Sequence, residues 1–364
     1  MRILNLVAGQ KWTGIAAVVF DQTAALVAAG VEAQFGFVGD SPLAERLLPL
    51  GWARPLMTPR RGPLAAARES RILADTLARE RFDVVHAHAT HDHWLALRAI
   101  RGARPRPRLV RTIHNLRHAR GGAATRFLFG RTDAFSFGNR EIASAFGKEG
   151  SVHSPVIDAG RFVPADSSER ARAAAGLPRT GILAGTVGKM ADGRGHPEAI
   201  RAAAAVAGVT LVHVGHGERM PDWKGLAASC GAAERNVWLG YREDDLPELY
   251  RAWDMFVFPA SGSEQGQRAI LEAMASGIPV VALAVPGVSD LITDGVEGIV
   301  ARSERELSEG IARLARDPAL ARSMGARGRE RALAFTGERY AARVSAFYEE
   351  VLRENGAARA TRPE

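Results

Sequence analysis

The chain has 364 residues, 46% hydrophobic and 24% charged, which suits two globular domains with a core each. Its single cysteine, Cys230, excludes an internal disulfide and a cysteine-rich zinc site. No apolar run is long enough to cross a membrane, and Met1-Arg2-Ile3 leads directly into a strand-like segment without a signal-peptide profile, so we expect a cytoplasmic protein.

The positive net charge of the chain lies in its first half. Residues 1–165 carry 23 basic and 13 acidic side chains, a net charge of +10, whereas the remaining residues have a net charge of −2. The densest part, residues 101–132, has nine arginines and no acid. Such a surface favours an anionic acceptor or an anionic membrane, and a solvated arginine-rich face is the alternative. No recognition helix, zinc finger or RNP motif is present, so nucleic acid is not expected as a partner.

Apolar runs alternate with helical stretches in this half, which predicts a doubly wound parallel sheet. The predicted strands are 2–8, 32–38, 83–88, 108–114 and 134–138. A turn that ends at Gly14 follows the first strand, and a helix begins at about Ile15. The positive end of that helix would face a phosphate, and Gly14 allows close approach.

Histidines cluster in the same half, and the cluster holds six of the ten in the chain: His86, His88, His91, His93, His114 and His118. Imidazoles two residues apart reach one metal ion only in particular geometries, and the chain offers neither thiolates nor an H-E-x-x-H pattern. We therefore predict no metal site. His91 and His93 are expected to cap or decorate the helix that begins near Thr90.

A second set of alternating strands and helices follows a break at residues 154–166, where prolines and a glycine interrupt the pattern. Its predicted strands are 182–188, 209–214, 236–239, 254–258, 279–284 and 298–301. The predicted domains are residues 1–165 and 166–335, with a last helix at about 336–354 and a frayed tail at 355–364.

The most informative segment is residues 263–282, in which seven residues separate the carboxylates of Glu264 and Glu272. A short buried strand precedes it, so the polar turn lies at a strand's carboxyl end, where open α/β sheets bind ligands. Backbone N–H groups of the turn and of the next helix can meet phosphate or sugar hydroxyls. Solvated carboxylates on a helix surface are the alternative interpretation.

This E-x7-E element, followed by E-A-M-A-x-G-x-P-V-V-A, resembles that of the retaining family 4 glycosyltransferases, which have the GT-B fold. The resemblance implies an α/β architecture of two Rossmann-like domains that face a cleft. The N-terminal domain would bind the acceptor, the C-terminal one would bind the donor, and the last helix would return to the first domain.

Two further elements resemble the same family, with departures. Lys189 and Arg194 occupy the phosphate-binding positions of the V-G-R-L-x3-K-G pattern with the two residue types exchanged, and only Gly14 matches the usual glycine pair of the first turn. The E-G-F-G that is typical after the first Glu is replaced by Glu264-Gln265-Gly266-Gln267-Arg268.

The resemblance assigns roles by position. It places His114 and Glu264 at the reacting sugar, with Glu272 on the ribose hydroxyls. The other implied residues are Gly14, Lys189, Arg194, Gln265, Gly266 and Gln267 for the donor, Gly215 and Tyr241 for the base, and His86, His88 and Arg117 on the acceptor side.

The implied reaction is a retaining, metal-independent transfer of a sugar from a UDP-, GDP- or ADP-sugar to an acceptor hydroxyl, without a cofactor. The expected acceptor is a glycan or a lipid-linked molecule, as in lipopolysaccharide or other surface glycan synthesis, with peripheral contact at the inner face of the cytoplasmic membrane. The alternatives are a sugar-nucleotide epimerase or phosphorylase of the same fold, and a catalytically silent sugar-nucleotide-binding protein.

Overall fold

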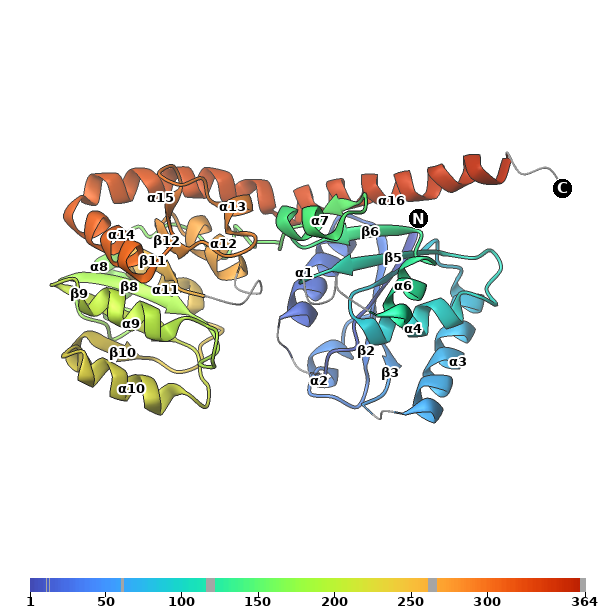
Figure 1. Cartoon of the computed structure of the whole chain (residues 1–364), viewed down its shortest axis with the longest axis horizontal. Coiled ribbons are helices and arrows are strands. Elements are labelled where there is room, and N and C mark those ends of the chain that lie inside the picture. Colours follow the sequence, from blue (N-terminus) through green and yellow to red (C-terminus); the bar gives the residue numbers. More distant parts are fainter. Residues whose placement is uncertain (11, 13, 60–61, 116–121, 261–266, 361–364) are drawn as a thin grey trace. The chain divides into compact units, whose positions relative to one another are not determined.

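The computed structural model describes residues 1–10, 12, 14–59, 62–115, 122–260 and 267–360, which form two compact units (Figure 1). Unit 1 comprises Met1–Val156 together with Gly337–Glu364, and unit 2 comprises Ile157–Thr336. The chain therefore passes from one unit to the other twice. Residues 157–165, which the sequence analysis assigned to the first domain, belong to unit 2.

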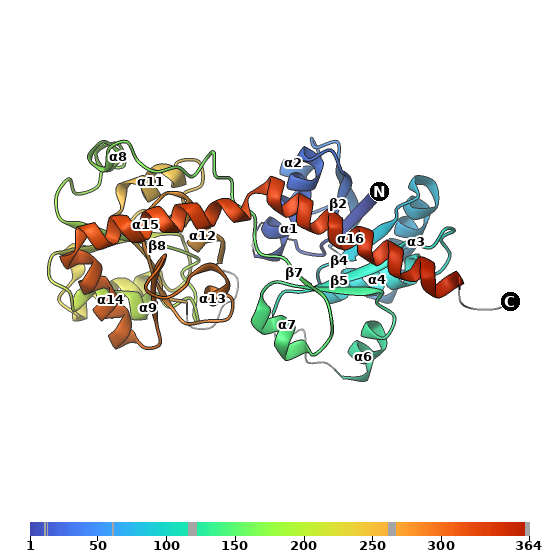
Figure 2. The ribbon, with the colours of Figure 1, turned by 90° about the horizontal axis from the view of Figure 1, so that it is seen from above.

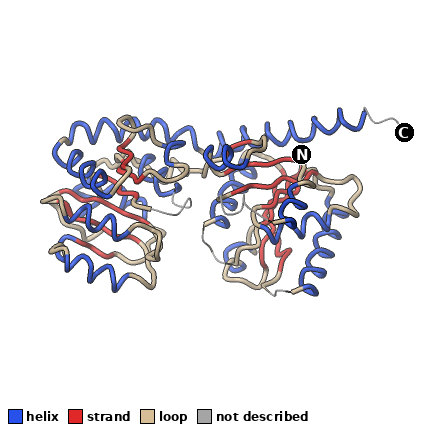
Figure 3. The backbone as a smooth tube through the Cα atoms, in the orientation of Figure 1, coloured by secondary structure: helices blue, strands red, loops and turns tan. Residues whose placement is uncertain are grey.

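Unit 1 is an open sheet with helices on both faces (Figure 3). Its seven strands pair in parallel in the order β3-β2-β1-β4-β5-β6-β7. The strands are β1 (Arg2–Leu6), β2 (Glu32–Val38), β3 (Ala53–Met57), β4 (Val84–Ala87), β5 (Arg108–Ile113), β6 (Ala134–Phe137) and β7 (Ser151–Val152). The helices are α1 (Ile15–Ala28), α2 (Ala44–Leu47), α3 (Pro63–Glu80), α4 (Thr90–Ala99), α6 (Ala123–Phe129), α7 (Arg140–Phe146) and α16 (Gly337–Ala360).

Alternate residues of the central strands face the two helical layers of unit 1. Ile3, Val84 and Val110 pack against α1 and α16, whereas Leu4 packs with α3 and α4 on the opposite face. Helix α16 lies beside α1 although most of the chain separates the two (Figure 2). Both faces of the sheet are thus covered, as a parallel sheet requires.

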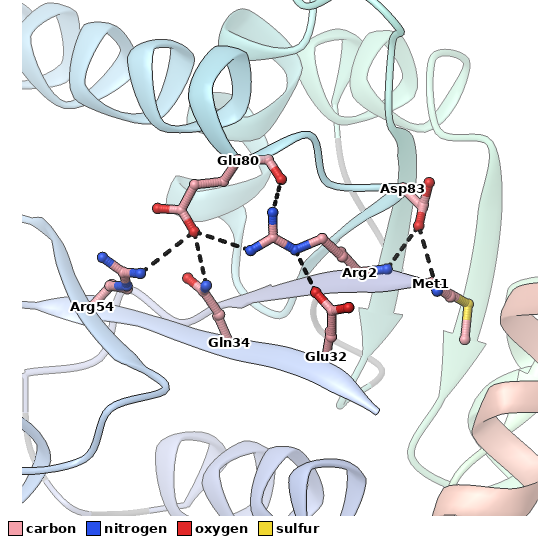
Figure 4. Close-up of polar contacts among 7 residues, drawn as sticks. All are labelled: Met1, Arg2, Glu32, Gln34, Arg54, Glu80 and Asp83. Atoms are coloured by element: carbon pink, nitrogen blue, oxygen red, sulfur yellow. Dashed lines mark hydrogen bonds and ion pairs between the residues drawn. The ribbon is translucent and has the colours of Figure 1, made fainter. Parts of the chain in front are cut away.

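A polar cluster closes the amino edge of this sheet (Figure 4). The Glu80 carboxylate accepts hydrogen bonds from Gln34 at 2.9 Å and from Arg54 at 3.4 Å, and it lies 3.5 Å from a guanidinium nitrogen of Arg2. Arg2 also pairs with Glu32 at 2.8 Å. These contacts tie α3 to the three strands β1, β2 and β3. They lie at the edge opposite to the strands' carboxyl ends.

Unit 2 repeats the architecture with six parallel strands in the order β10-β9-β8-β11-β12-β13. The strands are β8 (Ile182–Val187), β9 (Val209–Val214), β10 (Asn236–Trp238), β11 (Met255–Phe258), β12 (Val280–Leu283) and β13 (Gly298–Ala301). The α-helices are α8 (Ser168–Ala174), α9 (His196–Ala204), α10 (Met220–Ser229), α11 (Leu246–Ala252), α12 (Gln267–Ala275), α13 (Val288–Leu291), α14 (Glu304–Arg316) and α15 (Pro318–Ala332). Short 3₁₀ turns are η1 (Ala233–Arg235) and η3 (Leu333–Phe335).

The core of unit 2 also has two layers. Leu183 and Phe256 pack with α11 and α12 on one face, and Ala184 and Val257 pack with α9 and α14 on the other. Gly185 in β8 admits the Trp253 ring, because a Cβ atom at this position would lie 2.0 Å from the ring atoms.

The predicted strands agree with the observed ones to within two residues at each end, but two strands were missed. β3 contains Arg54 and Pro55 and lies at the sheet edge, where proline is tolerated, so its sequence lacks an apolar run. β7 has only two residues. The predicted end of the last helix at 354 was wrong, because α16 continues to Ala360.

Candidate functional site

The strand order of unit 2 reverses between β8 and β11, because β9 and β10 extend the sheet on one side and β12 and β13 on the other. Ligands of open α/β sheets bind beyond the carboxyl ends of the strands at such a switch point. The loop after β8 holds Lys189 and Arg194, and the segment after β11 leads into α12. The predicted phosphate-binding and carboxylate elements of unit 2 therefore follow the two strands that flank the switch point.

Close backbone packing fixes the loop after β8. Gly195 has φ +76°, and a Cβ atom there would lie 1.7 Å from the carbonyl oxygen of Pro259, directly after β11. Only glycine allows the two loops to approach this closely. Within the loop, Lys189 is exposed and lies 3.6 Å from Glu218, and burial lowers the pKa of Arg194. Both predicted phosphate ligands are thus held on one anchored loop.

The loop after β9 packs on the same segment. Gly215 has φ +139°, and a Cβ atom there would lie 1.9 Å from the carbonyl oxygen of Gly188. The Met190 N–H donates to the His216 carbonyl at 3.1 Å, and the Gly215 N–H donates to the Gly240 carbonyl at 2.7 Å. Gly215, which was predicted to line the base pocket, therefore follows β9 and contacts the segments that follow β8 and β10.

His196, at the start of α9, packs against the loop after β8, a role that the sequence analysis did not assign to it. Its ring stacks on Trp223 with a centroid separation of 4.7 Å. Burial lowers the pKa of His196 to about 4, although hydrogen bonding to the backbone of Lys189 and Gly188 acts in the opposite direction. The ring is therefore neutral at pH 7 and acts as a packing element. Its position before a proline at the start of α9 was the only sequence signal.

Glu272 lies on α12 and is 4% exposed. Its two carboxylate oxygens accept hydrogen bonds from the Arg268 guanidinium at 2.9 Å and from the Tyr250 hydroxyl at 3.0 Å. Burial raises the pKa of the Tyr250 hydroxyl, and the neighbouring Glu272 carboxylate raises it further, so Tyr250 stays a donor. The sequence analysis named Arg268 only as a departure from the family pattern, and it did not name Tyr250, which lies 22 residues before Glu272.

The other predicted donor residues of unit 2 lie at different places. Gln267, at the start of α12, is buried and donates from its amide to the Pro286 carbonyl at 3.2 Å. Tyr241 is 67% exposed and its hydroxyl donates to Glu243 at 2.9 Å. Glu264, Gln265 and Gly266 lie outside the described residues.

The strand order of unit 1 reverses between β1 and β4. Gly14, with φ +51°, precedes α1 after β1, and His88 follows β4 directly. His88 Nδ1 lies 3.1 Å from His114 Nε2, beyond the end of β5. The structure thus brings together His88 and His114 at the carboxyl edge of the sheet. Arg117, predicted on the same side, lies outside the described residues.

His86 points into the layer between the sheet and α16. Its Nδ1 lies 2.7 Å from the Tyr348 hydroxyl, and its Nε2 lies 2.6 Å from the Thr112 hydroxyl. Burial lowers the pKa of His86 well below its usual value, with smaller effects from neighbouring positive groups. His86 is therefore a buried neutral ring in the interior, although the sequence analysis placed it on the acceptor side.

Asp92 caps the turn after β4. Its carboxylate accepts hydrogen bonds from the backbone N–H groups of His88, Ala89 and His93 at 2.7 to 3.1 Å. Burial raises the pKa of Asp92 to about 6, and the positive charge of Arg111, 4.0 Å away, opposes this shift. The turn that presents His88 is thus fixed by an acid that the sequence analysis did not single out.

Of the two histidines that flank Asp92, which were predicted to cap or decorate the helix, only His93 differs from that prediction. His93 is buried and lies 3.0 Å from the Thr132 hydroxyl, and burial lowers its pKa to about 3. His91 is exposed and lies 2.9 Å from the buried carboxylate of Glu69. His93 is therefore part of the core.

Aromatic and basic side chains meet on α4 and α6. The Phe127 ring stacks with Trp94 at 5.9 Å, and the Arg131 guanidinium lies over the same ring at 3.6 Å.

Within the described ranges, no helix is long and apolar enough to span a membrane. Among the same residues, no group of three or more His, Cys, Asp and Glu side chains is placed to hold a metal ion.

Comparison with solved structures assigns the class. Anabaena HepE in complex with UDP superposes with a TM-score of 0.84 at 20% identity, covering 96% of this chain and all of that one. The lipopolysaccharide outer core galactosyltransferase WaaB superposes with a TM-score of 0.75 at 13% identity, covering 96% of this chain and 99% of that one. These likenesses and the two parallel-sheet units define the GT-B fold.

Comparison with protein families assigns the chain more narrowly. Residues 12–148 match Glycosyltransferase Family 4, and residues 182–317 match Glycosyl transferases group 1. The chain therefore belongs to the family 4 glycosyltransferases, which confirms the predicted family.

Curated relatives share part of their length with this chain. The 2-deoxystreptamine glucosyltransferase of Streptomyces kanamyceticus is 32% identical over 193 residues, which are 50% of each chain. A D-inositol 3-phosphate glycosyltransferase of Acidothermus cellulolyticus is 30% identical over 256 residues, 60% of this chain and 56% of the relative. The chain thus spans about half the length of the curated relatives that it matches.

Proposed function

We propose that this protein transfers a glycosyl unit from a nucleotide diphosphate sugar to an acceptor hydroxyl, with retention of the anomeric configuration and without a divalent metal. Unit 2 binds the donor, and unit 1 binds the acceptor. The observation that carries the proposal is the anchored loop after β8, which holds Lys189 and Arg194 at the switch point of unit 2.

The loop suits a diphosphate for electrostatic reasons. Departure of the nucleotide from an oxocarbenium-like transition state builds negative charge on the diphosphate. Cations and backbone N–H groups that are already in place stabilise that charge without reorganisation. Lys189 and Arg194 supply two positive charges, and the contact of Gly195 with the Pro259 carbonyl holds the loop that carries them. These two cations supply the charge neutralisation that a bridging metal provides in other transferases.

Glu272 suits the ribose of the nucleotide. A carboxylate accepts several hydrogen bonds, and vicinal hydroxyls can donate two of them. Arg268 and Tyr250 each hold one carboxylate oxygen, so the group is oriented before a ligand arrives. Orientation in advance lowers the entropy that is lost on binding.

The acceptor is proposed to be anionic and rich in hydroxyls. The net charge of +10 in residues 1–165 favours a phosphorylated or otherwise acidic molecule. The names of the similar proteins include glycosyltransferases for D-inositol 3-phosphate and for the lipopolysaccharide outer core. A phosphate-bearing glycan, in free or lipid-linked form, fits both the charge and these names. Such an acceptor places the protein in the cytoplasm, at the inner face of the membrane when the acceptor is lipid-linked.

Thermal stabilisation by UDP, GDP and ADP, each in the presence of a chelator, tests the donor site. UDP is the first choice because HepE structures contain UDP and UDP-glucose. A ligand at about 100 times its Kd stabilises the folded state by about 2.7 kcal/mol. We expect Glu272→Gln to abolish the shift.

Glu297→Gln is the matched control. Glu297 is also buried and paired with an arginine, Arg331 at 3.4 Å, but it lies at the amino edge of the sheet, before β13. This variant should keep the nucleotide-induced shift. If none of the three nucleotides stabilises the wild type or the control variant, the proposed donor site is wrong.

Release of nucleotide diphosphate from the donor separates the remaining alternatives. Acceptor-dependent release without metal supports the transferase. Conversion of the donor into its epimer supports a sugar-nucleotide epimerase, phosphate-dependent release supports a phosphorylase, and binding without any turnover supports a silent sugar-nucleotide-binding protein.

A further inference from the structure

Four residues of unit 1 form a buried chain of hydrogen bonds that ends at His114. The Thr23 hydroxyl on α1 donates to the Val19 carbonyl at 2.7 Å. The Asn5 amide on β1 donates to the Thr23 hydroxyl at 2.9 Å, and the Asn5 amide oxygen lies 3.3 Å from His88 Nε2. His88 Nδ1 then lies 3.1 Å from His114 Nε2. Asn5, Thr23 and His88 are each at most 2% exposed.

The hydrogen bond from Thr23 to the Val19 carbonyl determines which group donates in each of the other hydrogen bonds. A hydroxyl has one hydrogen, and Thr23 uses it on the Val19 carbonyl, so Thr23 accepts from Asn5. The nitrogen of the Asn5 amide must therefore face Thr23, and the amide oxygen faces His88. That oxygen is an acceptor, which requires a hydrogen on His88 Nε2. Neutral His88 then has an unprotonated Nδ1, and this nitrogen accepts from His114 Nε2.

The reverse assignment leaves buried groups without hydrogen bonds. With the hydrogen on His88 Nδ1, the lone pair of Nε2 would face the oxygen of Asn5. A flipped Asn5 amide would instead turn its oxygen toward a Thr23 hydroxyl that has no second hydrogen to give. An unmade buried hydrogen bond disfavours a state by about tenfold to a hundredfold. The assignment follows from the network, as ring hydrogens are assigned in general.

We propose that Thr23, Asn5 and His88 are positioning residues that place a hydrogen on His114 Nε2, so that the neutral ring of His114 has its lone pair on Nδ1. The chain runs from a backbone carbonyl of α1, through β1 and the end of β4, to the residue after β5. It connects elements on both sides of the switch point of unit 1. It therefore ties the tautomer of His114 to the folded sheet.

The surroundings keep His88 neutral, as the chain requires. Burial lowers the pKa of His88 well below its usual value, and the neighbouring groups His86, His114, Arg111 and His153 lower it further. The His86 ring stacks on His88 with a centroid separation of 4.2 Å. A neutral ring with one fixed hydrogen can only accept at Nδ1.

The functional consequence rests on the proposed glycosyl transfer. If His114 contacts the donor sugar, a neutral ring with its lone pair on Nδ1 accepts a hydrogen bond from a sugar hydroxyl. A ring with the opposite tautomer would present an N–H group to the same hydroxyl. The buried chain would thus select the direction of this hydrogen bond before the sugar binds.

Imidazole ¹⁵N spectra of the full-length, histidine-labelled protein test the proposal without any ligand. The signals of His114 are assigned by their loss in His114→Gln. We expect hydrogen on Nε2 and none on Nδ1 in the wild type. A His114 that carries its hydrogen on Nδ1 in the wild type overturns the proposal, whatever the variants do.

Asn5→Leu removes the acceptor of His88 while keeping a similar side-chain volume. We expect His114 to change to a mixture of tautomers, and Thr23→Val to cause a smaller shift in the same direction. Thr132→Val is the matched control, because it removes the hydroxyl that lies against the buried His93, in the same unit but outside the hydrogen-bond network of His88. An Asn5→Leu protein that is folded and has an unchanged His114 signal contradicts the proposal.

Kinetics add an independent result. Asn5→Leu should lower kcat about tenfold, the effect of one lost hydrogen bond, and leave the affinity for the nucleotide unchanged. Absence of turnover with every donor, combined with the expected spectra, would reject glycosyl transfer and leave the tautomer assignment intact. Equal losses of kcat in Asn5→Leu and Thr132→Val would indicate a structural effect and reject the positioning role.

Discussion

Acidification should destabilise unit 1 more than unit 2, because the buried histidines are unequally distributed. Among the described residues, unit 1 holds four, at positions 86, 88, 93 and 153, and unit 2 holds two, at positions 196 and 213. Burial lowers the pKa of all six, to about 4 for His153 and to about 3 for His213, for example. A histidine in the unfolded chain titrates at about 6.5.

The sign follows from proton uptake. Below pH 6.5 the unfolded chain binds protons that the folded histidines do not bind, so stability is present above this pH and is lost as the pH falls through 6.5 toward the folded pKa values. Each histidine costs about 1.4 kcal/mol between pH 7.5 and 5.5. Asp92 acts in the opposite direction, since its raised pKa of about 6 makes the folded state take up a proton first. That gain is about 0.8 kcal/mol over the same interval.

The net loss expected between pH 7.5 and 5.5 is about 5 kcal/mol for unit 1 and about 3 kcal/mol for unit 2. Hydrogen exchange with mass spectrometry in urea measures both values in one sample, from peptides of β4 and β5 and of β8 and β11. Equal losses in both units, or a larger loss in unit 2, would refute the reasoning.

His153→Leu provides the internal control for this prediction. Both ring nitrogens of His153 are buried without a hydrogen-bond partner among the described residues, and the ring packs on Tyr340 and Phe347 of α16. Leucine should keep the packing at pH 7.5 and reduce the acid-induced loss in unit 1 by about 1.4 kcal/mol. An unchanged loss would show that this ring does not take part in the transition.

Two further variants test the loop after β8. Gly195→Ala should lower nucleotide affinity at least about tenfold, which is about 1.4 kcal/mol of binding free energy, because its Cβ atom would overlap the Pro259 carbonyl. Gly193→Ala is the control, since Gly193 has a similar φ of +74° but nothing within 4 Å of its Cβ position. Equal losses of affinity in isothermal titration would exclude the close contact as the cause. Glu218→Gln removes the charge that pairs with Lys189 at 3.6 Å, so nucleotide affinity should rise about twofold to threefold at low salt and return to the wild-type value at high salt. A salt-independent change would rule out an electrostatic origin.

The sequence predicted the sheets well because buried parallel strands are continuous apolar runs, such as Met255–Phe258. It also predicted that the loop with Lys189 and the turn before Glu272 each follow a buried strand, whereas the strand order that places these two strands at a switch point came from the structure. It could not predict the partners of these groups. Tyr250 reaches Glu272 across 22 residues, and Asn5 reaches His88 across 83, through packing of separate elements.

The same limit applies to His86, which the sequence analysis placed on the acceptor side. Its place in an H-x-H pattern indicated a functional surface, but successive residues of a strand face opposite layers, so His86 shares the face of Val84, which packs with α16. His86 therefore points toward α16, where Tyr348, 262 residues later, meets it. Only the position of the last helix decides that this histidine is interior.

The return of α16 to unit 1 has a consequence for synthesis on the ribosome. Unit 2 is one continuous stretch of chain and can complete its fold as soon as residue 336 has emerged. Unit 1 begins first but finishes last, because Ile3, Val84 and Val110 pack against α1 and are fully covered only when α16 has also been made. Until then the nascent protein exposes an apolar sheet face. A chain that stops after residue 336 would retain a complete unit 2 together with an unfinished, aggregation-prone unit 1.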